Sequence, residues 1–226
     1  MKKELTGEQI AQLFEFTRKH YVEFYDVQVE LVDHLASSIE TDLELNTASN
    51  FDIALSNVFG SFGIFGFGDV IEQKAKAVWR NQWKLWFKIF KSQFKFPALL
   101  SGICIWLSLF TLLSFFNSYG VCLLASVSLF ILSLSYLINE HYLLKRTMNK
   151  KLILINQRYT YISFSYLPLY LMQFSGNWIA SQNQLLIASI FTLLGLLILS
   201  YRSTSKIVFN EARELYPEAF KDYAVS

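Results

Sequence analysis

The sequence predicts an all-α membrane protein, in which a four-span transmembrane helical bundle made of two hairpins follows a small cytoplasmic three-helix domain and a basic amphipathic neck helix. Two stretches without a charged residue, 97–139 and 159–201, carry most of this prediction. Each is long enough for two helices that cross a bilayer core of about 30 Å and for the turn that joins them. The polar first third of the chain and the basic segment behind it account for the other two parts.

The first 68 residues, which we call the head, form the acidic part of the chain. Residues 1–73 carry four basic and thirteen acidic side chains. A surface that binds nucleic-acid phosphates needs the opposite sign, so we expect no nucleic acid among the partners of the head.

Capping residues and apolar spacing predict three short helices in the head. Thr6 and Gln9 have the spacing of a capping box that begins the first helix. The second helix begins near Asp26, and one apolar residue recurs at every fourth position. These apolar residues are Val27, Leu31, Leu35 and Ile39. Asn50 is the expected N-cap of the third helix, and Gly60 is its expected end.

The order of residues in the second and third helices resembles a known domain. The run Glu30–Leu35 is followed by an acidic helix tail to Glu44, then by Ile53–Leu55 and by Phe59-Gly60. Over residues 20–75 this order is similar to the HAAS-type domain of bacterial membrane proteins, and to the small helical prefix domain found before the membrane part of some bacterial permeases. The resemblance implies protein–protein regulation at a bacterial membrane rather than catalysis.

The acidic face of the second helix is the expected partner-binding surface. Its candidate residues are Glu30, Asp33 and His34. These three also place two acids and an imidazole on adjacent turns, but no second histidine follows at i+4, so we expect no metal there.

The neck, residues 69–96, is expected to be a basic amphipathic helix. Residues 74–95 carry seven basic and no acidic side chains. Aromatic side chains prefer the headgroup region and long basic side chains reach lipid phosphates, so we expect the neck to bind anionic lipid headgroups of the inner leaflet. The residues expected at this interface are Lys76, Trp79, Arg80, Trp83, Lys84, Trp86, Lys88, Lys91 and Lys95. The alternative is that its aromatic stripe packs against the head or a partner protein.

Residues 97–201 form the expected transmembrane domain. We expect its spans at about 97–116, 119–138, 157–176 and 184–201. The turns inside the two hairpins carry no charge, whereas the segment between the hairpins is basic. Because Lys and Arg are concentrated on cytoplasmic loops, we expect both termini in the cytoplasm, with residues 202–226 as a cytoplasmic tail. The chain is therefore expected in the bacterial inner (cytoplasmic) membrane.

The third span is the most polar of the four. Its expected polar face comprises Tyr159, Ser163, Tyr166, Tyr170 and Gln173. Polar groups in hydrocarbon are costly unless they are paired, so this face is expected to turn toward other spans, a partner or a cavity. It either ties a bundle core by hydrogen bonds, with a bend at Pro168, or lines a ligand or ion path. The start of the span stays open between Leu152 and Tyr159.

Residues with catalytic chemistry are scarce. Cys104 and Cys122 both fall inside expected spans, which gives neither a disulfide framework nor a metal signature. The unambiguous parts of the spans contain no acid or base, which argues against proton-coupled transport and intramembrane proteolysis. We expect no catalytic residue, cofactor or metal, and we interpret the chain as a non-catalytic accessory or regulatory subunit. The alternative is a small transporter or channel component that works as a homo-oligomer, with the third span lining the path.

Overall fold

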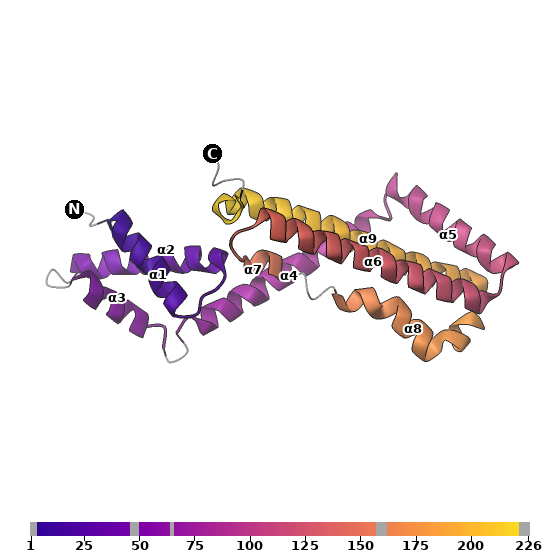
Figure 1. Cartoon of the computed structure of the whole chain (residues 1–226), viewed down its shortest axis with the longest axis horizontal. Helices are drawn as coiled ribbons and strands as arrows, with labels where there is room; N and C mark the ends of the chain where they lie inside the picture. The colour runs from indigo at the N-terminus through magenta and orange to yellow at the C-terminus, as the bar shows by residue number, and fades with distance from the viewer. Residues whose placement is uncertain (1–3, 46–49, 64–65, 157–161, 222–226) are drawn as a thin grey trace. The chain divides into compact units, whose positions relative to one another are not determined.

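The computed structural model describes residues 4–45, 50–63, 66–156 and 162–221, without the side chains of residues 162–165. Its named elements are all helices, and the described residues add only one isolated β-bridge, between Met148 and Phe220. The chain divides into two compact units (Figure 1). The head unit comprises residues 1–79, 148–157 and 212–226, and the span unit comprises residues 80–147 and 158–211.

Three helices begin the head unit: α1 (Gly7–Lys19), α2 (Tyr25–Leu45) and α3 (Phe51–Gly60). The capping box of α1 is confirmed, because the Thr6 side chain accepts from the Gln9 N–H and the Gln9 side chain accepts from the Thr6 N–H. The N-cap of α3 is confirmed as well, since Asn50 Oδ1 accepts from the Ile53 N–H at 2.9 Å. Helix α2 starts one residue before the expected Asp26.

The core of the head unit is built on α2. Its four-residue stripe is buried as expected: Val27, Leu31, Leu35 and Ile39 are each at most 1 % exposed. Leu13 of α1 and Ala54 of α3 pack into the same cluster. Burial of these apolar side chains supplies most of the stabilisation of the unit.

An aromatic turn closes one end of this core. Phe67 is buried, and its ring lies 5.1 Å from that of Phe59 and 5.0 Å from that of Phe62. Gly63 and Gly66 both have positive φ, 74° and 52°, a conformation that favours glycine. The glycines therefore let the chain reverse and return Phe67 to the core.

Helix α4 (Gly68–Ser92) covers most of the predicted neck, and α5 (Ala98–Phe115) follows after Pro97. Helix α4 begins in the head unit and continues in the span unit. Val78, Gln82 and Trp86 are buried, and this four-residue spacing places them on one face of the helix.

Three helices of the described residues are long and apolar enough to cross a membrane: α5, α6 (Ser118–Thr147) and α9 (Gln184–Leu215). By length and composition the chain is therefore a membrane protein. The most apolar window of α9 is 50 % buried, against 11 % in α5 and 17 % in α6, so α9 is the innermost of the three. The predicted third span corresponds to α8 (Ile162–Ala180), which contains Pro168 and is not among these three helices.

Helices α6 and α9 run parallel to each other. A Cβ added to Gly195 of α9 would lie 3.7 Å from Leu129 of α6, and further along both helices Tyr201 donates to Glu140. Helix α8 runs antiparallel to α6, because the Tyr166 ring lies 5.3 Å from Phe130 and Gly176 faces Tyr119. A Cβ on Gly176 would lie 3.2 Å from the Tyr119 ring, so glycine permits this close approach.

Helix α9 does not end at the predicted membrane boundary. It continues through the predicted tail to Leu215, and a short 3₁₀ helix, Pro217–Ala219, follows. The charged residues from Arg202 onward end the hydropathic stretch, but they do not interrupt the helical backbone.

Candidate functional site

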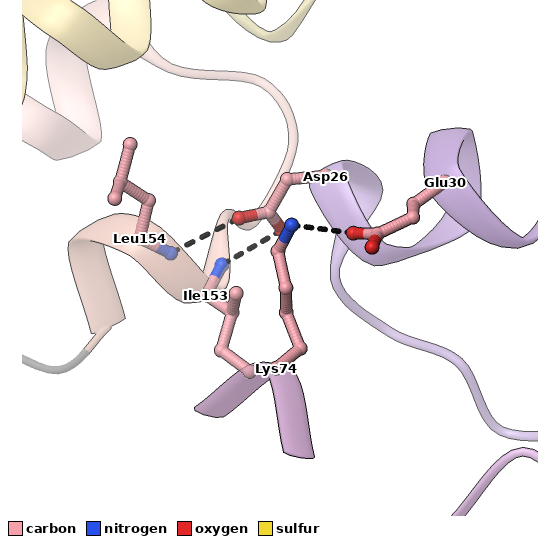
Figure 2. Close-up of polar contacts among 5 residues, drawn as sticks. All are labelled: Asp26, Glu30, Lys74, Ile153 and Leu154. Carbon is pink, nitrogen blue, oxygen red and sulfur yellow. Dashed lines mark hydrogen bonds and ion pairs between the residues drawn. The ribbon is translucent and has the colours of Figure 1, made fainter. Parts of the chain in front are cut away.

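The candidate site lies in the head unit, where a buried carboxylate holds a distant segment of the chain. Asp26, in the first turn of α2, is 1 % exposed. Its Oδ1 accepts from the Ile153 N–H at 2.9 Å and its Oδ2 from the Leu154 N–H at 3.0 Å (Figure 2). Both donors belong to the first turn of the short helix α7 (Ile153–Asn156). Asp26 thus satisfies two N–H groups that a helix start leaves without intrahelical partners.

Apolar burial explains why this segment lies against α2. Leu152, Ile153 and Ile155 are 2 %, 3 % and 8 % exposed, and Ile153 belongs to the same core cluster as Leu31 and Leu35. These apolar side chains belong to an otherwise basic, polar segment, and the cluster on α2 gives them a buried apolar environment. The carboxylate and the apolar contacts therefore act together to hold residues 152–156.

The charge of Asp26 is costly where it lies. Burial raises the pKa of Asp26 above its ordinary range, and the hydrogen bonds from the Ile153 and Leu154 N–H groups only partly oppose this effect. These two donors compensate for part of the hydration that the carboxylate loses on burial. Without α7, the buried carboxylate would therefore have less compensation.

An ion pair lies beside Asp26. The Lys74 ammonium of α4 donates to the Glu30 carboxylate of α2 (Figure 2), and both side chains are half-buried. Burial opposes the charged form of Lys74, but the hydrogen bond and attraction of Glu30 outweigh it and raise the pKa of Lys74. The pair therefore joins the beginning of α4 to the first part of α2, one turn after Asp26.

A second group of contacts fixes the segment just before α7. The Tyr25 N–H donates to the Lys151 carbonyl at 2.8 Å, and the Lys150 ammonium lies 3.6 Å from the centre of the Tyr25 ring. Lys151 itself donates to Glu23 at 2.6 Å and holds the pKa of that exposed carboxyl below its usual value. Residues 150–151 are thus bound through both backbone and side chains.

The end of the chain joins the same place. The Tyr25 hydroxyl donates to Glu218 at 2.6 Å, and the Asn149 N–H donates to the Ala219 carbonyl at 3.0 Å. Ala219 and Phe220 are 0 % and 2 % exposed. The start of α2 therefore binds two segments, 148–156 and 216–220, which directly follow α6 and α9 in the chain.

The predicted partner-binding residues all lie on α2. Asp33 and His34 are exposed on α2, whereas Glu30 is engaged by Lys74. Among the described residues, no group of three His, Cys, Asp or Glu side chains is placed to hold a metal ion. The arrangement around Asp26 provides hydrogen bonds, an ion pair and apolar contacts, which bind chain segments together.

The predicted lipid-interface residues of the neck divide into exposed and buried ones. The exposed side is basic and comprises Lys76, Arg80, Lys84, Lys88, Lys91 and Lys95. Trp79 is 47 % exposed, while Trp86 is only 8 % exposed and Trp83 is half-buried. Exposed Trp79 favours a lipid contact and buried Trp86 favours packing against protein, so both interpretations of the neck keep support.

The predicted polar face of the third span lies partly outside the described residues. Tyr159 is not described, nor is the side chain of Ser163. Tyr166 and Tyr170 are 42 % and 52 % exposed, and Gln173 is exposed as well. The rings of Tyr166 and Tyr170 follow one another along α8, with 6.3 Å between their centroids.

Sequence reasoning did not identify Asp26, Tyr25 or Ile153 as site residues. One signal was available: the run Leu152–Ile155 is four apolar residues inside an otherwise basic loop. Such a run needs a buried surface outside the membrane if it does not begin a span. The sequence does not indicate which acid it would find.

The comparisons with known proteins do not add a family. No family model, curated protein or solved structure matches the chain. The resemblance of residues 20–75 to the HAAS-type domain therefore stays a prediction.

Proposed function

We propose that the chain is a non-catalytic accessory or regulatory subunit of the bacterial inner membrane, which binds a protein partner through its cytoplasmic head and its transmembrane helices. The observation that carries the proposal is the attachment at Asp26 and Tyr25, where the head holds the segments that leave α6 and α9. A partner that binds the head and shifts α2 would change the free energy of these attachments, and with it the constraint on two membrane helices.

The four-span topology is part of this proposal, and two observations support it. Tyr25, residues 148–156 and Glu218 contact one another, so they lie on one side of the membrane, and an even number of crossings must separate each from the next. Between 156 and 218 this condition is met when α8 crosses together with α9. The antiparallel course of α8 along α6 supports the same conclusion.

Thiol labelling tests this topology. In a background with Cys104→Ser and Cys122→Ser, we expect Ser118→Cys and Ser181→Cys to react with a membrane-impermeant maleimide on intact cells. Asn149→Cys is expected to react only after lysis, because basic loops stay in the cytoplasm. Ser181 follows α8, so a protected Ser181→Cys would contradict the crossing of α8, and labelling of Asn149→Cys on intact cells would contradict the orientation.

The alternative function is a transporter or channel component that works as a homo-oligomer. It is favoured by the exposed polar side chains of α8, which a second copy could cover: Tyr166, Tyr170 and Gln173. Polar groups left facing lipid are costly, so the face needs an occupant in either function.

Co-purification from a mild detergent separates the two functions. The accessory function predicts a heteromeric complex of defined stoichiometry with another protein, as measured by native mass spectrometry. A large homo-oligomer without a second protein would contradict it and favour the transporter. The Asp26→Ala variant is purified in the same way and compared with the unaltered protein, because it changes the head unit and leaves the sequence of the span unit unchanged.

A further inference from the structure

A cavity lies inside the span unit, between α6 and α9, and charged and polar side chains are part of its lining. Its volume is about 540 Å³. The side chains that matter for its chemistry are Tyr136 and Glu140 of α6 and Tyr201, Arg202, Ser205 and Lys206 of α9. One carboxylate and two cations thus face the same space.

The cavity is positioned at the level where the spans meet the headgroups. The charge-free stretches end at Asn139 on α6 and at Tyr201 on α9, and Glu140 and Arg202 are the next residues. Because α6 and α9 run parallel and Tyr201 contacts Glu140, the two ends lie at one depth. In a membrane, a cavity at that depth would face phospholipid headgroups, which are the most concentrated ligands there.

Glu140 is held in place without being neutralised. Tyr201 Oη donates to one carboxylate oxygen at 2.8 Å, and Ser205 Oγ donates to the other. A carboxylate has about four lone-pair positions, so each oxygen can still accept another hydrogen bond. Although Arg202 and Lys206 line the same cavity, neither forms an ion pair with Glu140 in the part of the chain that the structure describes.

The cations of the cavity are similarly available. Arg202 donates from one Nη1 to the Tyr136 hydroxyl at 3.2 Å, and its guanidinium lies 4.5 Å from the centre of that ring. Tyr136 therefore orients the guanidinium, and the contacts among the described residues leave most of its five N–H donors unused. A guanidinium with free parallel donors matches a phosphate group.

We propose that this cavity binds a zwitterionic phosphoethanolamine headgroup, whose ammonium donates to Glu140 and whose phosphate accepts from Arg202 and Lys206. A lipid with a phosphate but no ammonium leaves the Glu140 charge unpaired. A choline headgroup has no N–H with which to donate to a carboxylate. Selectivity for the primary ammonium is therefore the signature of the site.

Lipid retention by the full-length protein tests the proposal. The protein in mild detergent is offered equal amounts of phosphatidylethanolamine, phosphatidylcholine and phosphatidylglycerol with identical acyl chains, and bound lipid is counted by native mass spectrometry. We expect phosphatidylethanolamine to be retained about tenfold over phosphatidylcholine, the difference of one charge-assisted hydrogen bond. Equal retention of the three lipids would overturn the proposal.

Two variants separate recognition from folding. In Glu140→Gln, the preference of about tenfold for phosphatidylethanolamine over phosphatidylcholine is expected to disappear. Binding of phosphatidylglycerol is expected to be unchanged, because only the ammonium contact is lost. Arg202→Gln is expected to weaken both lipids, since both carry a phosphate. The matched control is Glu211→Gln, an exposed position of α9 outside the cavity, which leaves all three unchanged. If Glu140→Gln lowered the binding of phosphatidylethanolamine and phosphatidylglycerol equally, Glu140 would have a structural role and the proposal would be wrong.

The same headgroup chemistry occurs in a soluble molecule, and a competition arm distinguishes the sources. Soluble glycerophosphoethanolamine that displaces the lipid would identify the headgroup alone as sufficient for binding. Retention of the lipid against an excess of the soluble headgroup would identify the membrane lipid as the ligand. Either result supports recognition of phosphoethanolamine by the cavity.

Discussion

Replacing Asp26 with alanine is expected to release residues 152–156 from the head. The substitution removes the Asp26 acceptors of the Ile153 and Leu154 N–H groups, and a lost acceptor in a buried or partly buried place costs about 1–3 kcal/mol. Local opening that returns both groups to water is cheaper than unfolding the whole unit. Amide hydrogen exchange of full-length protein is the measurement. We expect exchange at Ile153 and Leu154 to rise about tenfold or more, with the amides of α3 unchanged.

Two further substitutions make this result specific. Asp33→Ala removes an exposed aspartate from the same helix and is expected to leave both amides unchanged. Asp26→Asn keeps one acceptor oxygen but turns an NH₂ donor toward the other N–H, so one amide is expected to exchange faster than the other. Unchanged protection of Ile153 and Leu154 in Asp26→Ala would mean that the apolar contacts of Leu152 and Ile155 hold the segment alone.

Local structure could be predicted from the sequence wherever the determining residues are close together in the chain. Thr6 and Gln9 are three positions apart, and the start and end of α3 are likewise decided by Asn50 and Gly60, at the two ends of a single short helix. Hydropathy predicted α5, α6 and the start of α9 for the same reason, because an apolar run can be recognised from consecutive residues alone.

The site could not be predicted, because its partners are far apart. Asp26 and Ile153 are 127 positions apart in the chain, and neither residue has a property that identifies the other as its partner. As an acid in the first turn of a helix, Asp26 has a sufficient local explanation without any distant contact. The run at Leu152 was ambiguous in a different way, since an apolar segment beside a charge-free stretch fits the start of a span equally well.

Hydropathy was also a poor guide to the packing of α8 and to the end of α9. Tyrosine, glutamine and proline lower the hydropathy of α8, although it packs along α6 with the closeness that Gly176 permits. Charged residues after Tyr201 suggested a separate tail, although good helix formers such as Lys206, Glu211 and Arg213 continue α9. Membrane depth and helix length are different quantities, and only the first of them is encoded in hydropathy.

Replacing Leu35 with alanine is expected to lower the free energy of unfolding of the head unit by about 2–5 kcal/mol. Leu35 is 0 % exposed at the centre of the α2 stripe, so truncation leaves a cavity among side chains from several helices. Small units are only marginally stable, and this loss is a large fraction of the total. Pulse proteolysis of the full-length protein in increasing urea measures the change. Ser38→Ala, at an exposed position one turn further along α2, is the matched control and is expected to change little.

The same variant shows which part of the chain binds the partner. Membrane insertion depends on the apolar helices α5, α6 and α9, so Leu35→Ala is expected in the membrane fraction at the level of the Ser38→Ala control. If the head carries the partner contact, the partner is lost from the detergent-purified complex in proportion to the unfolded head. Full retention of the partner by a protein whose head is measurably destabilised would contradict this and place the contact on the transmembrane helices alone. The comparison is decisive because one buried methyl-bearing side chain changes the head while no residue of the span unit is altered.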